Sequence, residues 1–574
     1  MRADQRDRPH PGLIAKDKRF SPCGPISMSV SLYATPSPAL QREVKRRRSF
    51  AIISHPDAGK TTLTEKFLLY GGALNLAGSV TARKNQRATT SDWMDLEKQR
   101  GISVSSTVLQ FEYKDCVVNI LDTPGHKDFS EDTYRVLTAV DAAVMVVDAG
   151  KGIESQTRKL FEVCRRRGVP IFTFMNKLDR PARPSMDLLD ELESVLGIHA
   201  FPVNWPLGDG PRFRGVYDRE QKQVHLFQRT VHGAFRAPVA VTGIEDESVK
   251  DAVEEGTYRQ VCDELELLEG AGADFDLKKV LAGELTPVFF GSAANNFGVQ
   301  LLLDRFLELS PAPAPRESGG MMIDPASEEF SAFVFKIQAN MNPKHRDRIA
   351  FVRIVSGQFK RDMDVINGRS GEKVRLANSQ RLFARERETV DDAFAGDVVG
   401  LVGNYDLLIG DTLSSQPGVT FDEIPRFAPE CFSFLHNKST AKYKRFRDGL
   451  QQLLKEGVAS EFVLIDSEGP QIPLLGAVGP LQFEVLQYRL EGEYAAETRI
   501  EQANWSLARW LKPKEGDPLA PDARPSLSLG AALARDSNGW LVALLPSEWA
   551  LKTFSDKNED WVISEQPFPP PSLK

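Results

Sequence analysis

Paired cysteines are absent from this chain. Its five cysteines are scattered and none forms a Cys-x-x-Cys pair, so we expect neither a disulfide framework nor a zinc site. No apolar run approaches the roughly 20 residues that a membrane-spanning helix needs, so no membrane partner is expected. A reducing, cytoplasmic location fits both absences.

An excess of basic residues is also absent. The chain has 72 lysines and arginines against 79 acidic residues, which gives a formal net charge of -7. Because a free-standing DNA-binding protein is usually basic, we expect no DNA partner, and any nucleic acid must meet local basic patches. With 574 residues the chain is too long for one hydrophobic core, so about three domains are expected.

Hydrophobic periodicity is absent from the first forty-odd residues, which are rich in proline, serine and arginine. We therefore predict a disordered tail at 1–44. A transit peptide is the alternative, but Asp4, Asp7 and Asp17 argue against it because such peptides contain few acidic residues. The basic run 45–48 is interpreted as a tail contact or a solubilising segment.

Short apolar runs alternate with helical patterns over 45–315. Strands are predicted at 50–53, 108–113, 116–121, 143–148, 170–175 and 287–290, and helices at 61–70, 131–139, 155–167 and 298–309. This alternation favours a mostly parallel sheet with helices on both faces. The pattern is interrupted at about 180–286, which we interpret as an insertion.

The proline-rich stretch 310–315 is predicted to be a stiff linker. Beyond it, short strands between glycine-containing turns predict a β-barrel at 326–420. Strands and helices mix again over 421–574, which predicts a third domain of the α/β, ferredoxin-like type. Gly479-Pro480 is expected to begin a helix there, because proline is favoured at the first helical position. The fold class is therefore multi-domain α/β.

The segment between the first strand and the first helix carries the strongest chemical signal: Ser54-His55-Pro56-Asp57-Ala58-Gly59-Lys60-Thr61. A loop that runs into a helix N-terminus supplies converging N–H groups and a positive dipole end, which suit phosphate. Lys60 is expected to reach the β- and γ-phosphates, and the Thr61 hydroxyl to bind Mg²⁺. Ser54 replaces the glycine that begins the general P-loop pattern, and a plain strand–helix turn is the alternative.

Asp122-Thr123-Pro124-Gly125 ends the next apolar strand. A carboxylate there can hold Mg²⁺ through water, and the Gly125 N–H can bond the γ-phosphate and sense its loss. His126 follows directly, and a side chain beside the sensing glycine can hold the attacking water in line. We therefore predict that His126 is catalytic, although a lone histidine is more often structural.

Asn176-Lys177-Leu178-Asp179 ends a further strand. The Asp179 carboxylate can accept hydrogen bonds from guanine N1–H and N2–H₂, a donor pair that adenine lacks, and such mismatches reject the wrong ligand by roughly 10⁴-fold. The Lys177 stem is expected to pack on the base, and Ser292-Ala293 to present an N–H to guanine O6. Together these residues predict GTP and GDP as the ligands.

Arg100-Gly101-Ile102-Ser103 lies between the two phosphate-contacting segments, where a mobile loop would close over the γ-phosphate. Ser103 is expected to be a Mg²⁺ ligand in the GTP state only. A surface turn is an equally good interpretation of this tetrapeptide alone.

These segments together resemble the translational GTPases, a class that includes elongation factors Tu and G. Within that class, further stretches are similar to the peptide chain release factor 3 family: 91–94, 97–100, 128–135, 335–348, 476–479 and 481–483. The likeness runs from about Ser49 to Trp510. In the family, Ser103 stands where elongation factors carry threonine, and His126 matches the histidine that positions water.

The resemblance implies a GTPase domain, a β-barrel and an α/β domain in that order. It implies a ribosome-stimulated GTPase that meets ribosomal RNA and proteins after the peptide is released. Such a factor promotes departure of class I release factors from the stop-codon site, and we expect it to be a monomer. One departure is 512–525, where the family leads us to expect helix but prolines remove helical N–H donors.

Two basic clusters are candidates for contact with ribosomal RNA phosphates. One contains Lys438, Lys442, Lys444, Arg445 and Arg447, and the other contains Lys344, His345, Arg346 and Arg348. A solvated helix face is the alternative for the first cluster.

Three other functions are alternatives for the whole chain. An elongation factor acting in translocation would carry further C-terminal domains. A guanine-nucleotide switch without turnover would leave His126 unexplained, and an ATP-dependent P-loop enzyme would leave Asp179 unexplained.

Overall fold

The computed structural model forms one compact unit over Pro36–Lys574, and the structural statements below concern the residues it describes. These are 37–72, 107–124, 128, 130–227, 239–270, 275–339, 348–383, 386–403, 405–421, 424, 427–465, 472–515 and 524–568.

A seven-stranded sheet forms the centre of the first domain. Its strands are β1 (Arg47–Ser54), β2 (Thr107–Tyr113), β3 (Cys116–Asp122), β4 (Ala142–Asp148), β5 (Ile171–Asn176), β6 (His199–Pro202) and β11 (Leu285–Phe290). They lie in the order β2-β3-β1-β4-β5-β11-β6, and every pair is parallel except β2 with β3. The predicted parallel sheet is confirmed.

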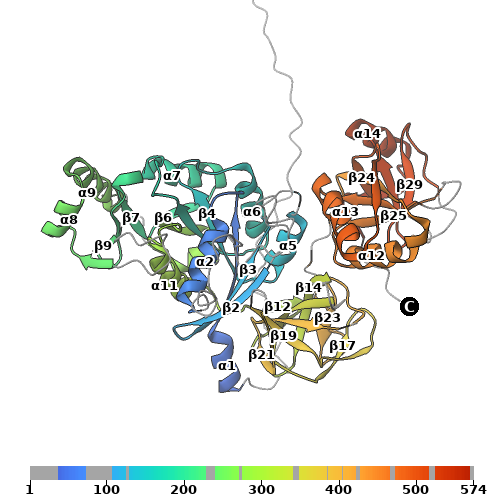
Figure 1. Cartoon of the computed structure of the whole chain (residues 1–574), viewed down its shortest axis with the longest axis horizontal. Helices are drawn as coiled ribbons and strands as arrows, with labels where there is room; N and C mark the ends of the chain where they lie inside the picture. The colour runs from blue at the N-terminus through green and yellow to red at the C-terminus, as the bar shows by residue number, and fades with distance from the viewer. Residues whose placement is uncertain are drawn as a thin grey trace, which may run out of the picture. The chain divides into compact units, whose positions relative to one another are not determined.

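Helices cover both faces of this sheet (Figure 1), because successive residues of a strand point to opposite sides. On one side Phe50 and Ile52 of β1 join a core with α2 (Lys60–Tyr70) and α11 (Val299–Leu309). On the other side Ala51 and Ile53 join a core with α5 (Ser130–Thr138) and α6 (Ser155–Arg166). Because both faces of the sheet are buried, the strands appear in the sequence as continuous apolar runs.

The predicted insertion at 180–286 has its own antiparallel sheet, in the order β10-β9-β8-β7. Its elements are α7 (Ser185–Glu191), β7 (Asn204–Leu207), β8 (Gly215–Asp218), β9 (Gln223–Phe227), β10 (Val239–Thr242), α8 (Glu247–Ala252), α9 (Glu255–Gly270) and α10 (Leu277–Leu281). The insertion is not wholly separate, because β6 pairs with β11 and extends the main sheet. A four-residue strand carries too little periodicity for sequence to place it.

Residues 38–45 correct the prediction of a disordered tail at 1–44. They form α1 (Pro38–Lys45), which begins where the Ser37 side chain accepts a hydrogen bond from the Leu40 N–H. Leu40 and Val44 lie one turn apart and are buried in the core of the second domain. Sequence missed this helix because only these two apolar residues mark its buried face.

The second domain is an antiparallel, barrel-like β structure, as predicted. Its main sheet has the order β18-β17-β23-β14-β15-β22-β19-β20, and β16 pairs with β21. The strands are β14 (Ser331–Ala339), β15 (Arg348–Ser356), β16 (Gln358–Lys360), β17 (Asp364–Asn367), β18 (Lys373–Arg375), β19 (Ser379–Phe383), β20 (Glu386–Thr389), β21 (Asp392–Phe394), β22 (Val398–Val402) and β23 (Thr412–Ser414). A hairpin of β12 (Arg316–Ser318) and β13 (Met321–Ile323) precedes them.

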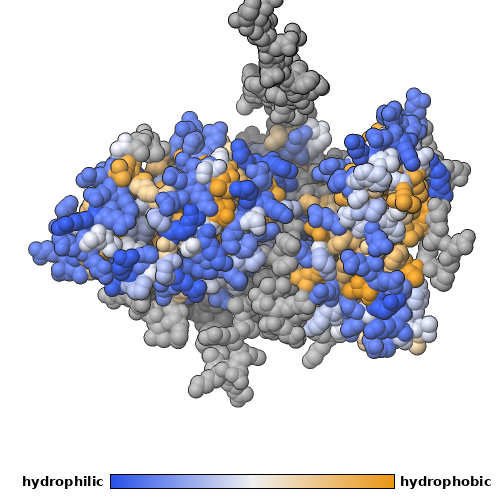
Figure 2. All heavy atoms as spheres, turned by 90° about the horizontal axis from the view of Figure 1, so that it is seen from above, coloured by the Kyte–Doolittle hydropathy of each residue, from blue (hydrophilic) through white to orange (hydrophobic). Residues whose placement is uncertain are grey.

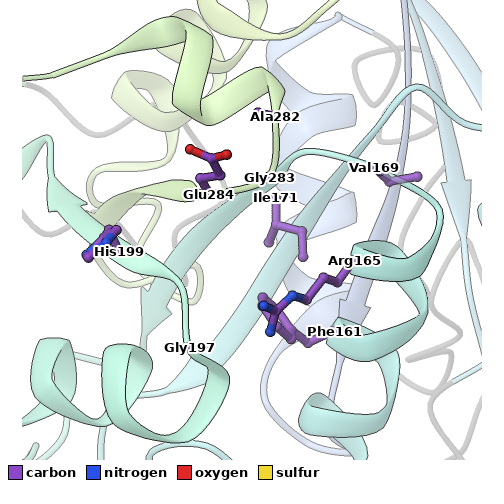
Figure 3. Close-up of a pocket in the computed structure, with 10 residues that line it drawn as sticks. Phe161, Arg165, Val169, Ile171, Gly197, His199, Ala282, Gly283 and Glu284 are labelled. Atoms are coloured by element: carbon purple, nitrogen blue, oxygen red, sulfur yellow. The ribbon is translucent and has the colours of Figure 1, made fainter. Parts of the chain in front are cut away.

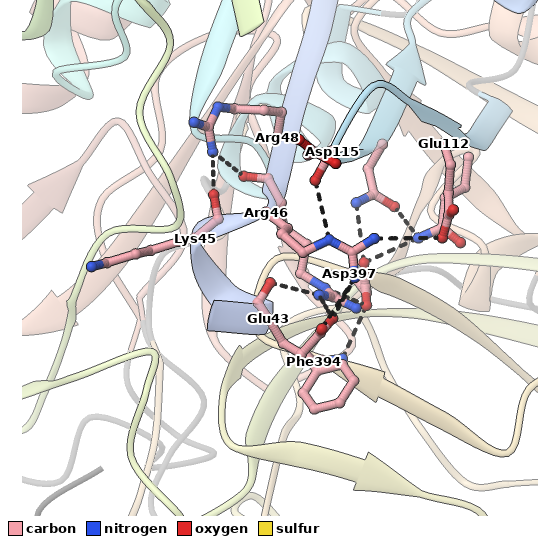
Figure 4. A network of polar contacts seen from close by, with 11 residues as sticks. Glu43, Lys45, Arg46, Arg48, Glu112, Asp115, Phe394 and Asp397 are labelled. Atoms are coloured by element: carbon pink, nitrogen blue, oxygen red, sulfur yellow. Dashed lines mark hydrogen bonds and ion pairs between the residues drawn. The ribbon is translucent and has the colours of Figure 1, made fainter. Parts of the chain in front are cut away.

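Buried charges join the first domain to the barrel (Figure 4). The Asp397 carboxylate accepts hydrogen bonds from Arg47 Nε at 2.8 Å, Gln110 Nε2 at 3.0 Å and Asn119 Nδ2 at 3.2 Å. Arg47 is 5% exposed, so for this residue of the run 45–48 both sequence-based interpretations, a tail contact and a solubilising charge, are wrong. Its charge is built into a domain interface, a property that only the fold reveals.

The third domain begins with the order β24-α12-β25-β26-α13-β27. These elements are β24 (Cys431–Asn437), α12 (Tyr443–Lys455), β25 (Ser460–Leu464), β26 (Leu474–Ala477), α13 (Pro480–Tyr494) and β27 (Thr498–Gln502). The strands lie antiparallel in the order β27-β24-β26-β25. Both the element order and the pairing are ferredoxin-like, which confirms the prediction, and Pro480 is the first residue of α13 as expected.

Four further strands extend this sheet beyond β25. They are β28 (Leu507–Pro513), β29 (Ala532–Arg535), β30 (Leu541–Leu545) and β31 (Trp561–Ser564), with α14 (Glu548–Lys557) packed on them. Within the proline-rich region 512–525, residues 512–513 end β28 and 516–523 lie outside the described ranges. Residues 512–515 and 524–525, which the structure describes, contain no helix.

No helix in the described residues is long and apolar enough to cross a membrane. Figure 2 shows a largely hydrophilic face on which hydrophobic residues gather in small groups. Exposed hydrophobic groups of that size are ordinary on a folded protein.

Candidate functional site

The residues that sequence assigned to phosphate, Ser54 to Thr61, run from the last residue of β1 through a loop into the first turn of α2. Asp57 has a φ of 65° and Gly59 a φ of 104°, so the chain turns sharply through left-handed conformations before α2 begins at Lys60. A Cβ on Gly59 would lie 2.2 Å from Asn176 Nδ2. Glycine is therefore required there both by backbone conformation and by the close approach of Asn176.

The N-terminus of α2 has no side-chain cap at Gly59. Its first-turn N–H groups therefore have no capping side chain, which suits a phosphate group bound at the positive end of the helix dipole. Lys60 Nζ lies 2.6 Å from Asp122 Oδ1, and both residues are buried, at 7% and 2% exposure. The structure thus brings together the two charged groups that sequence assigned to the phosphates and to Mg²⁺.

The segment after β3 is fixed to the neighbouring strand. Thr123 Oγ1 donates a hydrogen bond to the Ile52 carbonyl at 2.7 Å, and Pro124 O accepts one from Thr133 Oγ1 at 3.4 Å. Asp122 is held in place by these contacts. The other predicted residues of this region, Gly125, His126 and the 100–103 segment with Ser103, lie outside the described residues.

Asn176 joins the two ends of the predicted nucleotide site. Its Nδ2 donates to the Ala58 carbonyl at 2.8 Å, and its Oδ1 accepts from the Ala293 N–H at 2.9 Å. Asn176 is 2% exposed. One buried amide thus connects the phosphate loop after β1 with the loop after β11, which is why asparagine, both donor and acceptor, suits the position.

Asp179 lies beside Ser292, as the prediction of a guanine pocket requires. Ser292 Oγ donates to Asp179 Oδ1 at 2.6 Å, and the Leu178 N–H bonds to the Gly291 carbonyl at 3.2 Å. These contacts hold the Asn176–Asp179 segment against the loop that contains Ser292 and Ala293. The hydroxyl fixes one carboxylate oxygen and so orients the group that would read the base.

Sequence reasoning missed Asp148 and Glu154. Asp148 Oδ2 lies 2.8 Å from Lys177 Nζ, and Glu154 Oε1 lies 3.3 Å from His55 Nε2. Burial by itself raises the pKa of Asp148, but the Lys177 ammonium and the Gly150 N–H outweigh it and lower that pKa below its ordinary value. Asp148 ends β4 at the carboxyl edge of the sheet, a signal that could have identified it.

A cavity in the first domain lies at the edge of the sheet opposite these residues (Figure 3). It measures about 430 Å³ and is lined by Phe161, Arg165, His199, Glu284 and neighbouring residues. Ile171 and His199 begin β5 and β6, so this is the amino edge of the parallel strands. Ligands of open α/β sheets bind at the carboxyl edge, which favours the site around Lys60 and Asn176.

Three family descriptions match successive parts of the chain. Residues 45–312 match "Elongation factor Tu GTP binding domain", residues 329–416 match "Elongation factor G domain 2", and residues 421–555 match "Class II release factor RF3, C-terminal domain". These matches follow the order of the sheet domain, the barrel and the ferredoxin-like domain.

Curated relatives match over nearly their whole length. A protein from Gloeobacter violaceus named "Peptide chain release factor 3" is 55% identical over 91% of this chain and 98% of its own length. One of the same name from Symbiobacterium thermophilum is 51% identical over 91% of this chain and 97% of its own. A crystal structure from Thermus thermophilus shares the fold, with a TM-score of 0.63 and 24% identity over 87% of this chain and 73% of its own.

Proposed function

Since the chain belongs to the peptide chain release factor 3 family, it is a GTP-hydrolysing factor of translation termination, and we propose roles for its residues in that activity. The observation that carries the proposal is the buried bridge of Asn176 between Ala58 and Ala293. It joins the phosphate loop to the base loop, so one guanine nucleotide spans both.

Lys60 and the first-turn N–H groups of α2 bind the phosphates in this proposal. Asp179, oriented by Ser292, accepts the hydrogen bonds of the guanine edge, and the Lys177 stem covers the base. His126 positions the water that attacks the γ-phosphate.

Mg²⁺ fits the donors at this site. The Thr61 hydroxyl would bind the ion directly and the Asp122 carboxylate would hold it through water, and the described residues contain no cluster of three or more histidine, cysteine or acidic side chains. This sparse set suits an ion that takes most of its ligands from phosphate and water. Ser103 completes the proposed set. When bound, the ion would neutralise charge that develops on the phosphate oxygens.

In keeping with the family, we propose that this activity takes place on the ribosome, in the cytoplasm. We propose that the monomeric factor meets ribosomal RNA and proteins after peptide release and promotes departure of class I release factors. The lysines and arginines of α12 and the preceding turn support a phosphate contact, because Lys438, Lys444, Arg445 and Arg447 are all exposed. Arg348 is excluded from that role, since it donates to the Tyr405 and Leu407 carbonyls within the barrel.

GTP turnover with and without ribosomes tests the catalytic proposal. We expect ribosomes to raise turnover of the native chain, and His126→Ala to abolish that increase while GDP binding is retained. His199→Ala is the matched control, because that histidine is 77% exposed at the opposite sheet edge. Native turnover that ribosomes leave unchanged would refute the ribosomal part of the proposal.

Base recognition is tested by Asp179→Asn, which should shift preference from guanine to xanthine nucleotides. Asp190→Asn changes an exposed carboxylate on α7 and should leave the preference unchanged.

The termination role is tested by following release of a class I factor from terminated ribosomes with GTP and this protein. No acceleration over GTP alone would count against that role.

A further inference from the structure

Asp128 of the first domain caps a helix of the third domain. Its Oδ2 accepts a hydrogen bond from the Leu481 N–H at 3.0 Å, and the residue is 4% exposed. Helix α13 has Gly479 as its N-cap and Pro480 as its first residue. Because glycine offers no side chain and proline no N–H, Leu481 is the first donor of the helix, and its acceptor comes from another domain.

The N–H groups of Gly479 and Gln482 at this helix end find their acceptors within the third domain. The Gln482 N–H bonds to the Gly479 carbonyl at 3.2 Å, and Gln482 Oε1 accepts from the Gly479 N–H at 3.0 Å. Of these three donors, only the Leu481 N–H takes its acceptor from another domain. A carboxylate there also interacts favourably with the helix dipole.

The contact is tight at Gly479. A Cβ on this residue would lie 2.2 Å from Asp128 Cγ and 2.6 Å from each carboxylate oxygen. The φ of Gly479 is −146°, an extended conformation that any residue adopts. The need for glycine therefore comes from Asp128 and not from the backbone of the third domain.

A second contact lies on the same side of the first domain. Arg135 Nη1 of α5 donates to the Gly457 carbonyl, in the turn between α12 and β25, at 3.4 Å. Arg135 is also paired with Glu131 at 2.7 Å, which fixes its direction. The stretch 128–135 thus contacts the third domain at two points.

Asp128 follows the residues assigned to the γ-phosphate. Asp122 touches Lys60, Thr123 is bound to β1, and only three residues separate Pro124 from Asp128. We propose that Asp128 is a positioning residue that couples the nucleotide bound at this site to the third domain through α13. The inference rests on the proposed roles of Asp122, Gly125 and His126.

By thermodynamic linkage, such a coupling must appear in the relative affinities for GTP and GDP. If the contact of Asp128 with α13 differs in free energy between the GTP and GDP states, removing it changes the ratio of the two affinities. Couplings between sites of one protein typically change affinity by about fivefold or more. Both affinities can be measured on the isolated protein.

Two glycine-to-alanine variants in the same helix test the proposal. Gly479→Ala places a methyl group against Asp128, whereas a Cβ on Gly492 meets nothing within 4 Å. We measure dissociation constants for GDP and a non-hydrolysable GTP analogue by titration calorimetry, without ribosomes. Gly479→Ala should change their ratio by about fivefold or more, and Gly492→Ala should leave it unchanged. Equal ratios in both variants, or equal changes, would overturn the proposal.

Asp128→Ala is an independent test, since it removes the carboxylate that the methyl group added by Gly479→Ala would meet. The ratio should change in Asp128→Ala as in Gly479→Ala, and the double variant should change it no further, because both substitutions break one contact. Asp128→Asn retains an oxygen acceptor and should restore much of the native ratio. Additive changes of the ratio would contradict a shared contact.

Failure of the proposed function and failure of this inference give different results. A native chain that bound no guanine nucleotide would refute the proposed function, whereas normal binding with a ratio that the variants leave unchanged would refute this inference alone.

Discussion

The first domain meets its two neighbours in different ways. Against the barrel it uses buried ion pairs, Arg47 with Asp397 at 2.8 Å and Arg353 with Asp141 at 2.6 Å. Against the third domain it uses the Asp128 carboxylate on the start of α13. The barrel contact combines these ion pairs with hydrogen bonds from Gln110 and Asn119 to Asp397, whereas the Asp128 contact is a single hydrogen bond to a backbone N–H.

The two interfaces also lie on different parts of the sheet. Arg47 begins β1 and Asp141 directly precedes β4, so the barrel packs near the amino ends of the strands. Asp128 follows Asp122, at the carboxyl edge where the nucleotide residues gather. Because removing one partner of a buried ion pair is costly, the barrel interface should contribute more to stability than the Asp128 contact, which is the one we propose to depend on nucleotide.

The largest expected effect is on the barrel interface. Arg353→Met leaves the Asp141 carboxylate buried without its partner, which should cost about 3–5 kcal/mol of unfolding free energy. Arg361→Met removes an exposed pair with Asp391 and should cost less than about 1 kcal/mol. Differential scanning calorimetry measures the stability of both variants. Similar losses of stability would contradict the prediction that the buried pair contributes more than the exposed pair.

Asp397→Asn should lower the free energy of unfolding without changing the ratio of GDP to GTP affinity. Arg47 keeps its pair with Glu43 at 2.8 Å, so the expected loss of about 1.5–3 kcal/mol is smaller than for Arg353. The ratio of GDP to GTP affinity should stay native, because the network lies away from the phosphates. A ratio altered as strongly as in Gly479→Ala would show that the barrel interface also reads the nucleotide.

Asp128→Ala should change the ratio of GDP to GTP affinity and should affect stability little. Losing one helix cap costs about 1 kcal/mol, so the melting temperature should fall only slightly while the affinity ratio changes. Calorimetric melting of this variant beside Asp397→Asn measures the difference. A large loss of stability would mean that the Asp128 contact is a fixed part of the fold.

The smallest expected effect is a change in the alkylation rate of the Cys431 thiol, which lies in the third domain and is influenced by the charge of Asp128. Burial, followed by the charges of Asp128 and Glu430, raises the pKa of this thiol to about 11. Neutralising Asp128 as Asn should lower that pKa and raise the thiolate fraction at pH 9, speeding alkylation by iodoacetamide about threefold for each half unit. Peptide mass spectrometry measures the rate.

Cys164 is the internal control for that measurement. Burial raises its pKa to about 12, so it should stay unreactive in both proteins. Because a raised thiol pKa favours the protonated folded state, its contribution to stability is present below about pH 8.5 and is lost as pH rises toward 12. Equal alkylation of Cys431 with and without the Asp128 charge would contradict the proposed proximity.

The sequence by itself determined the sheet domain and its chemistry. Lys60, Asp122, Asn176 and Asp179 each follow an apolar strand, and parallel strands bring their carboxyl ends to one edge. Local spacing sufficed because each motif is contiguous and the fold class aligns the strands. The pairing of Ser292 with Asp179 and of Asp148 with Lys177 adds contacts that this rule allows but does not specify.

Only the tertiary structure decided how the domains meet. Arg47 resembles a solubilising charge in sequence and Gly479 resembles an ordinary helix start, yet one is a buried ion pair and the other a close fit for Asp128. Asp397 lies 350 residues from Arg47 along the chain, and Leu481 lies 353 from Asp128. Contacts at such separations leave no periodicity or spacing in the sequence, because they depend on how whole domains pack.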